Sequence, residues 1–184
     1  MESLERLQTE LLHGTDGDVL EFWEYQTRGK RRTDFRPRLE TEIARRIAAH
    51  LRRDLSGSQS AIIRREAEVQ WDERRTDIEV IVHGRSALGA EEWTVTIETK
   101  GCWNRGLRTA PKNQLARRYL IECGRTHGIY LVAWFRTLTG ARRTKLRQTT
   151  RAAVEADFRA LCQRTVENEP GLKVEPFILD CRRP

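Results

Sequence analysis

Residues 76–83 read TDIEVIVH and residues 92–100 read EWTVTIETK, and these two stretches decide the fold. In both, apolar residues occupy every second position, as Val95 and Ile97 do in the second stretch. Successive side chains of a strand point to opposite faces, so this alternation predicts two β-strands with one apolar face each. Only eight residues separate the two stretches, which favours an antiparallel hairpin.

The periodicity of the remaining chain predicts the other elements. Expected helices are Ser3–Leu12, Asp18–Tyr25, Leu39–Leu51, Thr109–Arg125 and Thr150–Val166, and further expected strands are Ala61–Gln70, Ile129–Trp134 and Lys173–Leu179. The order helix, three strands, helix, strand predicts an α/β fold with a mixed central sheet flanked by helices. Its first three strands form an antiparallel meander, and the helix after them makes a right-handed parallel crossover. Residues 1–36 are expected to be a helical appendage with a basic linker over Arg28–Arg38, and residues 37–184 the main domain.

Charge and composition narrow the choice of partner. The 184 residues carry a formal net charge of +7, and only five of the 34 basic residues are Lys. The planar guanidinium of arginine matches the geometry of phosphate oxygens, so the composition favours a polyanionic partner such as nucleic acid. The four cysteines fit no zinc motif, and the thiols are expected to be reduced in a cytoplasmic protein. No signal peptide is recognised, and the longest apolar run, Ile129–Phe135, is too short to span a membrane.

Three charged side chains are expected to converge where the two strands pair. Asp77 begins the first strand, while Glu98 and Lys100 end the second and share one face. Two adjacent carboxylates suit Mg²⁺, with Mn²⁺ as a substitute and the backbone carbonyl of Thr99 as a further ligand. Lys100 would orient or deprotonate water or neutralise developing charge. The alternative interpretation is a solvated strand end with a surface salt bridge.

The chain resembles the PD-(D/E)XK, or restriction-endonuclease-like, nuclease superfamily, and in particular bacterial members associated with genome defence. The resemblance covers Arg38–Phe135 and is carried by RTDI (75–78), IETKGCWN (97–104), QLARRYL (114–120) and GIYLVAWF (128–135). It implies a divalent-metal phosphodiesterase with Asp77 and Glu98 as metal ligands and Lys100 as the catalytic lysine.

Two positions depart from the family pattern. Thr76 precedes Asp77 where the family has proline, a change that the superfamily tolerates. Some branches carry Gln-x-x-x-Tyr on the helix after the lysine, whereas Gln114 and Tyr119 are one residue further apart. This spacing assigns Tyr119 to the core.

The same resemblance implies further site residues. The acid of the first helix is Glu42 or Glu40, with Glu42 preferred because it adjoins Ile43 of the buried stripe; the alternative is a surface glutamate paired with a nearby arginine. Gln114 is expected to hold the scissile phosphate or a metal-bound water. Nucleic-acid contacts are expected from a first basic cluster and from a second, with Trp103 stacking on a base or packing. The first cluster is Arg105, Arg108, Lys112, Arg117 and Arg118; the second is Arg142, Arg143, Lys145, Arg147 and Arg151.

The expected function is metal-dependent hydrolysis of DNA, with RNA left open. The rivals are a catalytically inactive nucleic-acid-binding module and an assembly module on the same fold. Cutting both strands of a duplex would require two active sites, and hence a homodimer or a larger defence complex.

Overall fold

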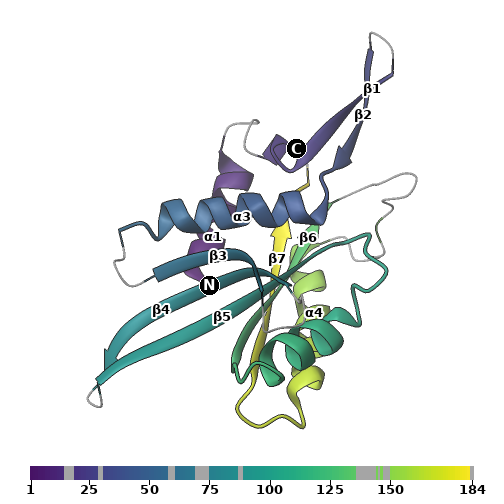
Figure 1. Ribbon diagram of the computed structural model, residues 1–184. Helices are drawn as coiled ribbons and strands as arrows, with labels where there is room; N and C mark the ends of the chain where they lie inside the picture. The colour runs from purple at the N-terminus through teal and green to yellow at the C-terminus, as the bar shows by residue number, and fades with distance from the viewer. Residues whose placement is uncertain are drawn as a thin grey trace.

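The computed structural model describes residues 1–14, 19–28, 31–57, 61–68, 75–86, 89–135, 144, 146 and 150–182. At its centre is a mixed sheet of five strands in the order β3-β4-β5-β6-β7 (Figure 1). The first three strands pair antiparallel, and β6 and β7 extend the sheet parallel to β5. The α/β class and the mixed sheet are therefore confirmed. The strands are Ala61–Glu68 (β3), Arg75–Ser86 (β4), Gly89–Gly101 (β5), His127–Trp134 (β6) and Lys173–Asp180 (β7).

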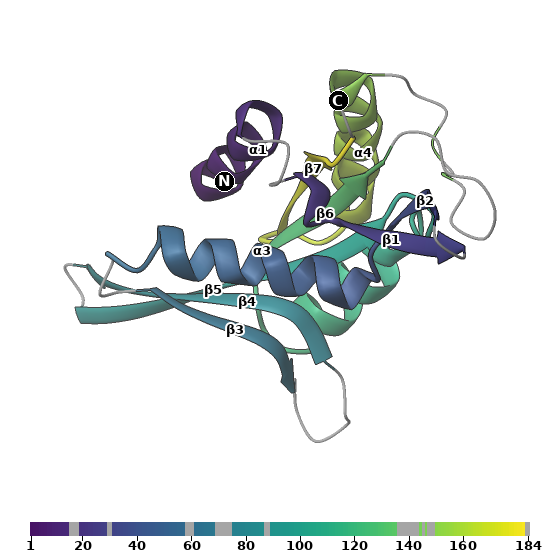
Figure 2. The same cartoon turned by 90° about the horizontal axis from the view of Figure 1, so that it is seen from above.

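Helices cover both faces of this sheet. They are α1 (Glu2–His13), α3 (Glu40–Asp54), η1 (Pro111–Ile121) and α4 (Arg151–Val166). Val80 of β4 lines a cavity together with Leu51 of α3, whereas the neighbouring Glu79 pairs with Arg125, just after η1. Neighbouring strand residues face opposite sides, so α3 and η1 lie on opposite faces of the sheet. Figure 2 shows α3 lying along the antiparallel strands, while α4 packs on η1 and β7.

The first 37 residues differ from the predicted helices and linker. Helix α1 is confirmed, and its leucines belong to the same hydrophobic core as the sheet. The helix predicted over Asp18–Tyr25 holds only at Val19 and Leu20 of the described residues and is wrong from Trp23 on. The linker predicted over Arg28–Arg38 is wrong, because the strands Trp23–Arg28 (β1) and Arg31–Pro37 (β2) pair as an antiparallel hairpin. Tyr25 stands opposite Phe35 in the register, and aromatic residues have a high propensity for strands.

The base of the hairpin is fixed to the core. The Trp23 indole is buried and donates from Nε1 to the carbonyl oxygen of Cys181 at 2.9 Å. Its ring meets that of Phe135 edge-on, with 4.9 Å between centroids. The described N-terminal segment is thereby tied to the end of the chain.

The helix predicted over Thr109–Arg125 is present, but it is wound as a π-helix. Its hydrogen bonds span five residues, as in the bond from the Glu122 amide to the Arg117 carbonyl at 3.1 Å. Such windings are rare and occur frequently at functional sites. The sequence contained no signal for the wider turn.

None of the helices within the described ranges has both the length and the apolar character needed to cross a membrane.

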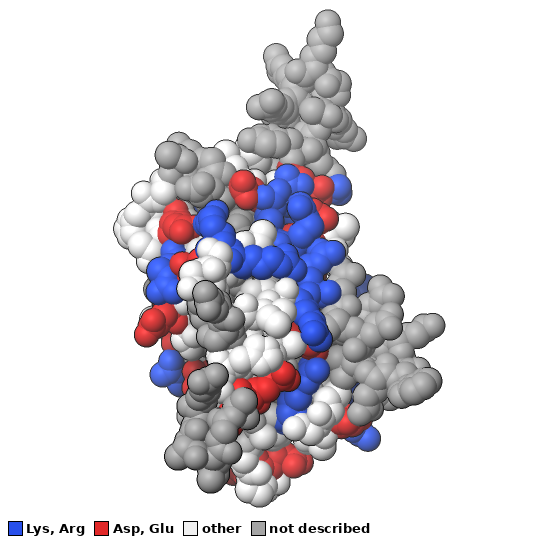
Figure 3. Space-filling view, turned by 60° about the vertical axis from the view of Figure 1, so that its left-hand side comes forward, with Lys and Arg blue, Asp and Glu red and all other residues white. Residues whose placement is uncertain are grey.

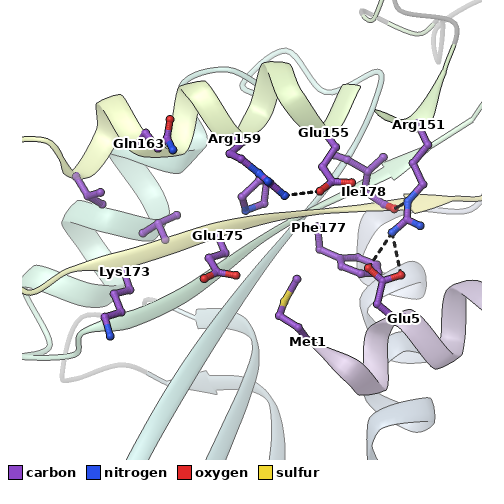
Figure 4. A pocket seen from close by; sticks show the side chains of 13 residues that line it. Met1, Glu5, Arg151, Glu155, Arg159, Gln163, Lys173, Glu175, Phe177 and Ile178 are labelled. Atoms are coloured by element: carbon purple, nitrogen blue, oxygen red, sulfur yellow. Dashed lines mark hydrogen bonds and ion pairs between the residues drawn. The ribbon is translucent and has the colours of Figure 1, made fainter. Parts of the chain in front are cut away.

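The outer edge of β7 is partly closed by side chains. The amides of Lys173 and Cys181 donate to Thr126, just before β6, and to Trp134 at its end. Ile178 and Asp180 lie an odd number of positions away, so they direct their backbone groups outward. Arg151 Nε donates to the Ile178 carbonyl at 3.0 Å. Figure 4 shows Arg151 also reaching Glu5, beside a cavity of about 530 Å³ between α1 and α4.

Gln8 closes the far end of this edge. Its side-chain Oε1 accepts from the Asp180 amide at 2.6 Å, and its Nε2 donates to the Asp180 carbonyl at 3.3 Å. Gln8→Ala would leave both buried backbone groups unpaired, so we expect a loss of about 2 kcal/mol in the free energy of unfolding, measured by urea titration. Gln163→Ala, at an exposed position on α4, should change it by less than about 0.5 kcal/mol. Equal effects of the two substitutions would contradict the edge-closing role.

Candidate active site

The register of β4 and β5 brings Asp77 and Glu98 together. Ile78 stands opposite Ile97, so Asp77 and Glu98, each one residue further along, face each other on the other side of the sheet. The Thr99 amide donates to Asp77 Oδ2 at 2.7 Å. The N–H and C=O of one strand residue point to the same side, so the Thr99 carbonyl is also directed toward the Asp77 end of β4.

Glu98 is held in an environment that disfavours its charge. The residue is 2% exposed. Burial, together with the negative charge of Asp77, raises its pKa to about 7, although Lys100 acts in the opposite direction. A cation between the two carboxylates would relieve this repulsion.

Lys100 already supplies one positive charge to the pair. Its Nζ lies 2.5 Å from Glu98 Oε1, and its side chain is 12% exposed. Burial alone would lower the pKa of Lys100, but attraction to Glu98, Asp77 and Glu40 outweighs burial and raises it. In this arrangement Lys100 is a charged donor rather than a neutral base.

Of the two candidate acids of α3, Glu40 contacts the end of β5, whereas the preferred Glu42 pairs with an arginine of its own helix. Glu40 Oε1 accepts from the Gly101 amide at 2.8 Å, and both of its carboxylate oxygens accept from Asn104 Nδ2, at 2.8 and 2.9 Å. Glu42 instead pairs with Arg45 at 3.0 Å, which lowers the pKa of Glu42. Glu40 therefore fixes the loop that follows β5.

Helical geometry explains this difference. Ile43 begins the buried stripe of α3, and Glu40 lies three positions before it, on the same helix face. Glu42 is adjacent to Ile43 in sequence, but neighbouring helix residues point in different directions. Spacing by three or four residues, rather than adjacency, therefore places Glu40 on the same helix face as Ile43.

The π winding of η1 places Gln114 and Tyr119 on one face. Hydrogen bonds in such a helix join residues five apart, so these two residues lie one above the other. Tyr119 is buried, as predicted, and burial followed by the charges of Glu98 and Asp77 raises its pKa to about 12. It therefore lies within electrostatic reach of the site as well as in the core. Gln114 lines a cleft of about 250 Å³ that also contains Lys100.

The donor set suits a magnesium ion. In the part of the chain that the structure describes, no three His, Cys, Asp or Glu side chains form a complete cage for a metal. Mg²⁺ rarely uses such a cage; it keeps several waters and takes one or two carboxylates together with phosphate oxygens. Asp77 and Glu98, with the Thr99 carbonyl, are a set of this kind.

Several predicted nucleic-acid contacts have other partners. Arg108 forms hydrogen bonds with both carboxylate oxygens of Asp157 on α4 and lies over the Phe158 ring. Trp103 is partly exposed; its ring packs against Phe135, with 5.5 Å between centroids, and covers Gly101. Of the remaining predicted contacts, Arg105, Lys112, Arg117 and Arg118 are exposed, and Arg151 pairs with Glu5. The others, Arg142, Arg143, Lys145 and Arg147, lie outside the described residues.

Sequence reasoning missed a second buried acid on the same strand face. Glu79 lies two positions after Asp77, is 2% exposed and forms an ion pair with Arg125. Arg125 Nη1 also donates to the Thr96 hydroxyl at 3.3 Å, which fastens the end of η1 to the sheet. The alternation that paired Glu98 with Lys100 applied equally to Asp77 and Glu79 and could have revealed this contact.

Comparisons of the chain with protein-family models, with curated proteins and with solved structures gave no match.

Proposed function

We propose that the protein is a divalent-metal-dependent nuclease of the PD-(D/E)XK type that hydrolyses phosphodiester bonds of DNA. The observation that carries this proposal is the meeting of Asp77, Glu98 and Lys100 at one point of the β4–β5 ladder. The buried Glu98 carboxylate, facing the partly buried Asp77, destabilises the metal-free fold, and a purely structural strand end gains nothing from this pair. Strained electrostatics of this kind are typical of functional sites.

Each residue of the site has a role in this reaction. Asp77, Glu98 and the Thr99 carbonyl would hold the ion, which polarises the phosphodiester and activates water. Lys100, with its raised pKa, would orient the attacking water and neutralise charge that develops on the phosphate. Glu40 positions the loop after β5 through Gly101 and Asn104.

Nucleic acid as substrate is supported by charge. The net charge is +7, and Figure 3 shows Lys and Arg side chains gathered in a band along one face. Positive surfaces attract the phosphate backbone and raise the rate of encounter. The strand order, with helices on both faces, agrees with a restriction-endonuclease-like core, and the resemblance to defence-associated members makes genome defence the proposed context.

The proposal is tested by incubating the protein with supercoiled plasmid, labelled single-stranded DNA and labelled RNA. We expect DNA cleavage in Mg²⁺ or Mn²⁺ and none in EDTA. Salt-sensitive binding of DNA without cleavage under any metal would favour the inactive binding module. A stable complex with another protein and no affinity for DNA would favour the assembly module.

Substitutions of the two helix acids form a matched pair. Glu40→Ala removes three hydrogen bonds to the loop after β5, so we expect the rate of DNA cleavage to fall by roughly a hundredfold, because a small misplacement of catalytic groups is costly. Glu42→Ala, two residues away on the same helix, should stay within about twofold of the original protein, because its partner Arg45 is on the surface. The reverse order of effects would restore Glu42 as the helix acid.

A further inference from the structure

The cleft beside Lys100 has the walls of a binding site. It holds about 250 Å³, and one wall is formed by Thr109, Asn113, Gln114 and Arg118, from η1 and the turn before it. This volume is below the range typical of drug-sized pockets, so the cleft suits a single small unit. Its position next to Lys100 places any occupant beside the proposed scissile phosphate.

The winding of η1 decides which arginine reaches the cleft. The lining positions advance along the helix from Thr109 to Asn113 and Gln114 and then to Arg118. An α-helix, with 3.6 residues per turn, would continue this face through Arg117. Closure of hydrogen bonds over five residues lengthens the turn and brings Arg118 into line instead.

The two neighbouring arginines accordingly have different surroundings. Arg117 lies outside the cleft, with its side chain 77% exposed and its Nε 3.9 Å from Glu122 Oε1. Arg118 lines the cleft, and within the described residues it forms no ion pair. The π-helix therefore places the Arg118 guanidinium at the cleft with no acidic partner among the described residues.

The chemistry of the walls fits a nucleotide. Asn113 and Gln114 each offer a carbonyl acceptor and an amide donor, groups that bind the uncharged edges of a base or a sugar hydroxyl. Neither amide has a hydrogen-bond partner elsewhere in the described part of the protein. Arg118 supplies the planar fork that matches a phosphate.

We propose that this cleft binds the nucleotide next to the scissile phosphate, with Arg118 on the adjacent phosphate and the amides of Asn113 and Gln114 on the nucleoside. The proposal rests on the proposed nuclease function and names the part of the substrate that the enzyme holds. It also gives the π winding a purpose, because an ordinary helix would present Arg117.

The test uses thymidine 3′,5′-bisphosphate, which is one nucleotide with a phosphate on each side, titrated calorimetrically in EDTA. We expect Arg118→Gln to weaken its binding by roughly tenfold or more, because a charge-assisted hydrogen bond is lost. Arg117→Gln removes the same charge from the adjacent residue and should change binding by less than about twofold. Equal weakening by both variants, or no binding to the original protein, would overturn the proposal.

A second measurement separates a direct phosphate contact from general attraction. Binding of a labelled single-stranded oligonucleotide in EDTA is followed as the KCl concentration rises. Loss of one phosphate contact should reduce the slope of log affinity against log salt by about 0.7 in Arg118→Gln, with no change in Arg117→Gln. Asn113→Ala should lower the affinity and leave the slope unchanged; an altered slope would contradict the role of the amide.

These assays need no hydrolysis, so the two proposals fail separately. A protein that cleaves nothing but shows Arg118-dependent binding would retain this subsite and lose the nuclease assignment. A protein that cleaves DNA and responds equally to both arginine substitutions would retain the nuclease assignment and lose the subsite.

Discussion

Lys100→Ala is expected to reduce metal-dependent cleavage of DNA by roughly 10²- to 10⁴-fold, the range for loss of a positioned catalytic group. The reason is geometric: the Lys100 ammonium lies 2.5 Å from Glu98 Oε1, at the end of β5 where Asp77 also arrives. Replacing Lys100 with alanine removes the positive charge that would neutralise charge developing on the phosphate. The initial rate of plasmid nicking in Mg²⁺ measures the effect.

The matched control for this change is Lys173→Ala, at an exposed position on β7. It removes the same charge and should leave the nicking rate within about twofold of the original protein. The melting temperature and DNA affinity of Lys100→Ala are measured alongside, so that loss of folding or of binding is recognised. A folded, DNA-binding Lys100→Ala protein with full activity would remove Lys100 from the mechanism.

Glu98→Gln is expected to stabilise the metal-free protein at pH 8. The pKa of Glu98 is about 7 in the folded chain against 4.5 for an ordinary glutamate, so the folded state holds its proton more tightly than the unfolded state. The metal-free fold therefore loses stability as pH rises from about 4.5 to about 7. Above pH 7 the ionised Glu98 lowers the free energy of unfolding by about 3 kcal/mol, and replacing it with the uncharged glutamine removes this loss.

Thermal unfolding in EDTA at a series of pH values measures this effect. We expect the melting temperature of Glu98→Gln to exceed that of the original protein by about 5 to 10 °C at pH 8 and to converge with it near pH 4. Glu175→Gln, at an exposed position on β7, should follow the original protein at every pH. Parallel curves for Glu98→Gln and the original protein would show that Glu98 carries no such penalty.

Magnesium should reverse the difference in melting temperature between Glu98→Gln and the original protein. An ion that binds only the folded state raises its stability, and Glu98 is one of the two carboxylates proposed to hold it. The melting temperature of the original protein at pH 8 is therefore expected to rise with Mg²⁺ concentration, whereas that of Glu98→Gln should respond little. An equal response would place the ion elsewhere.

The helix assignments show where local pattern was insufficient. The apolar stripe of α3 was evident from its spacing, but the choice between Glu40 and Glu42 depended on the partner of each carboxylate. Glu40 accepts from Gly101, which is 61 positions away, and no property of residues 39–51 reports that contact. The hairpin β1–β2 was missed for a similar reason, because the burial of Trp23 depends on Phe135 and Cys181.

The sequence alone determined the strands of the sheet and the meeting of Asp77 with Glu98 and Lys100. Alternation within a strand and the short link between two strands are local properties, and pairing then follows from burial of the apolar faces. Only the tertiary structure decided that Glu40 fixes the loop after β5, that Gln8 closes the edge of β7 and that Arg118 rather than Arg117 lines the cleft. The first two are contacts between distant residues, and the third depends on a helix winding that single-residue propensities do not encode.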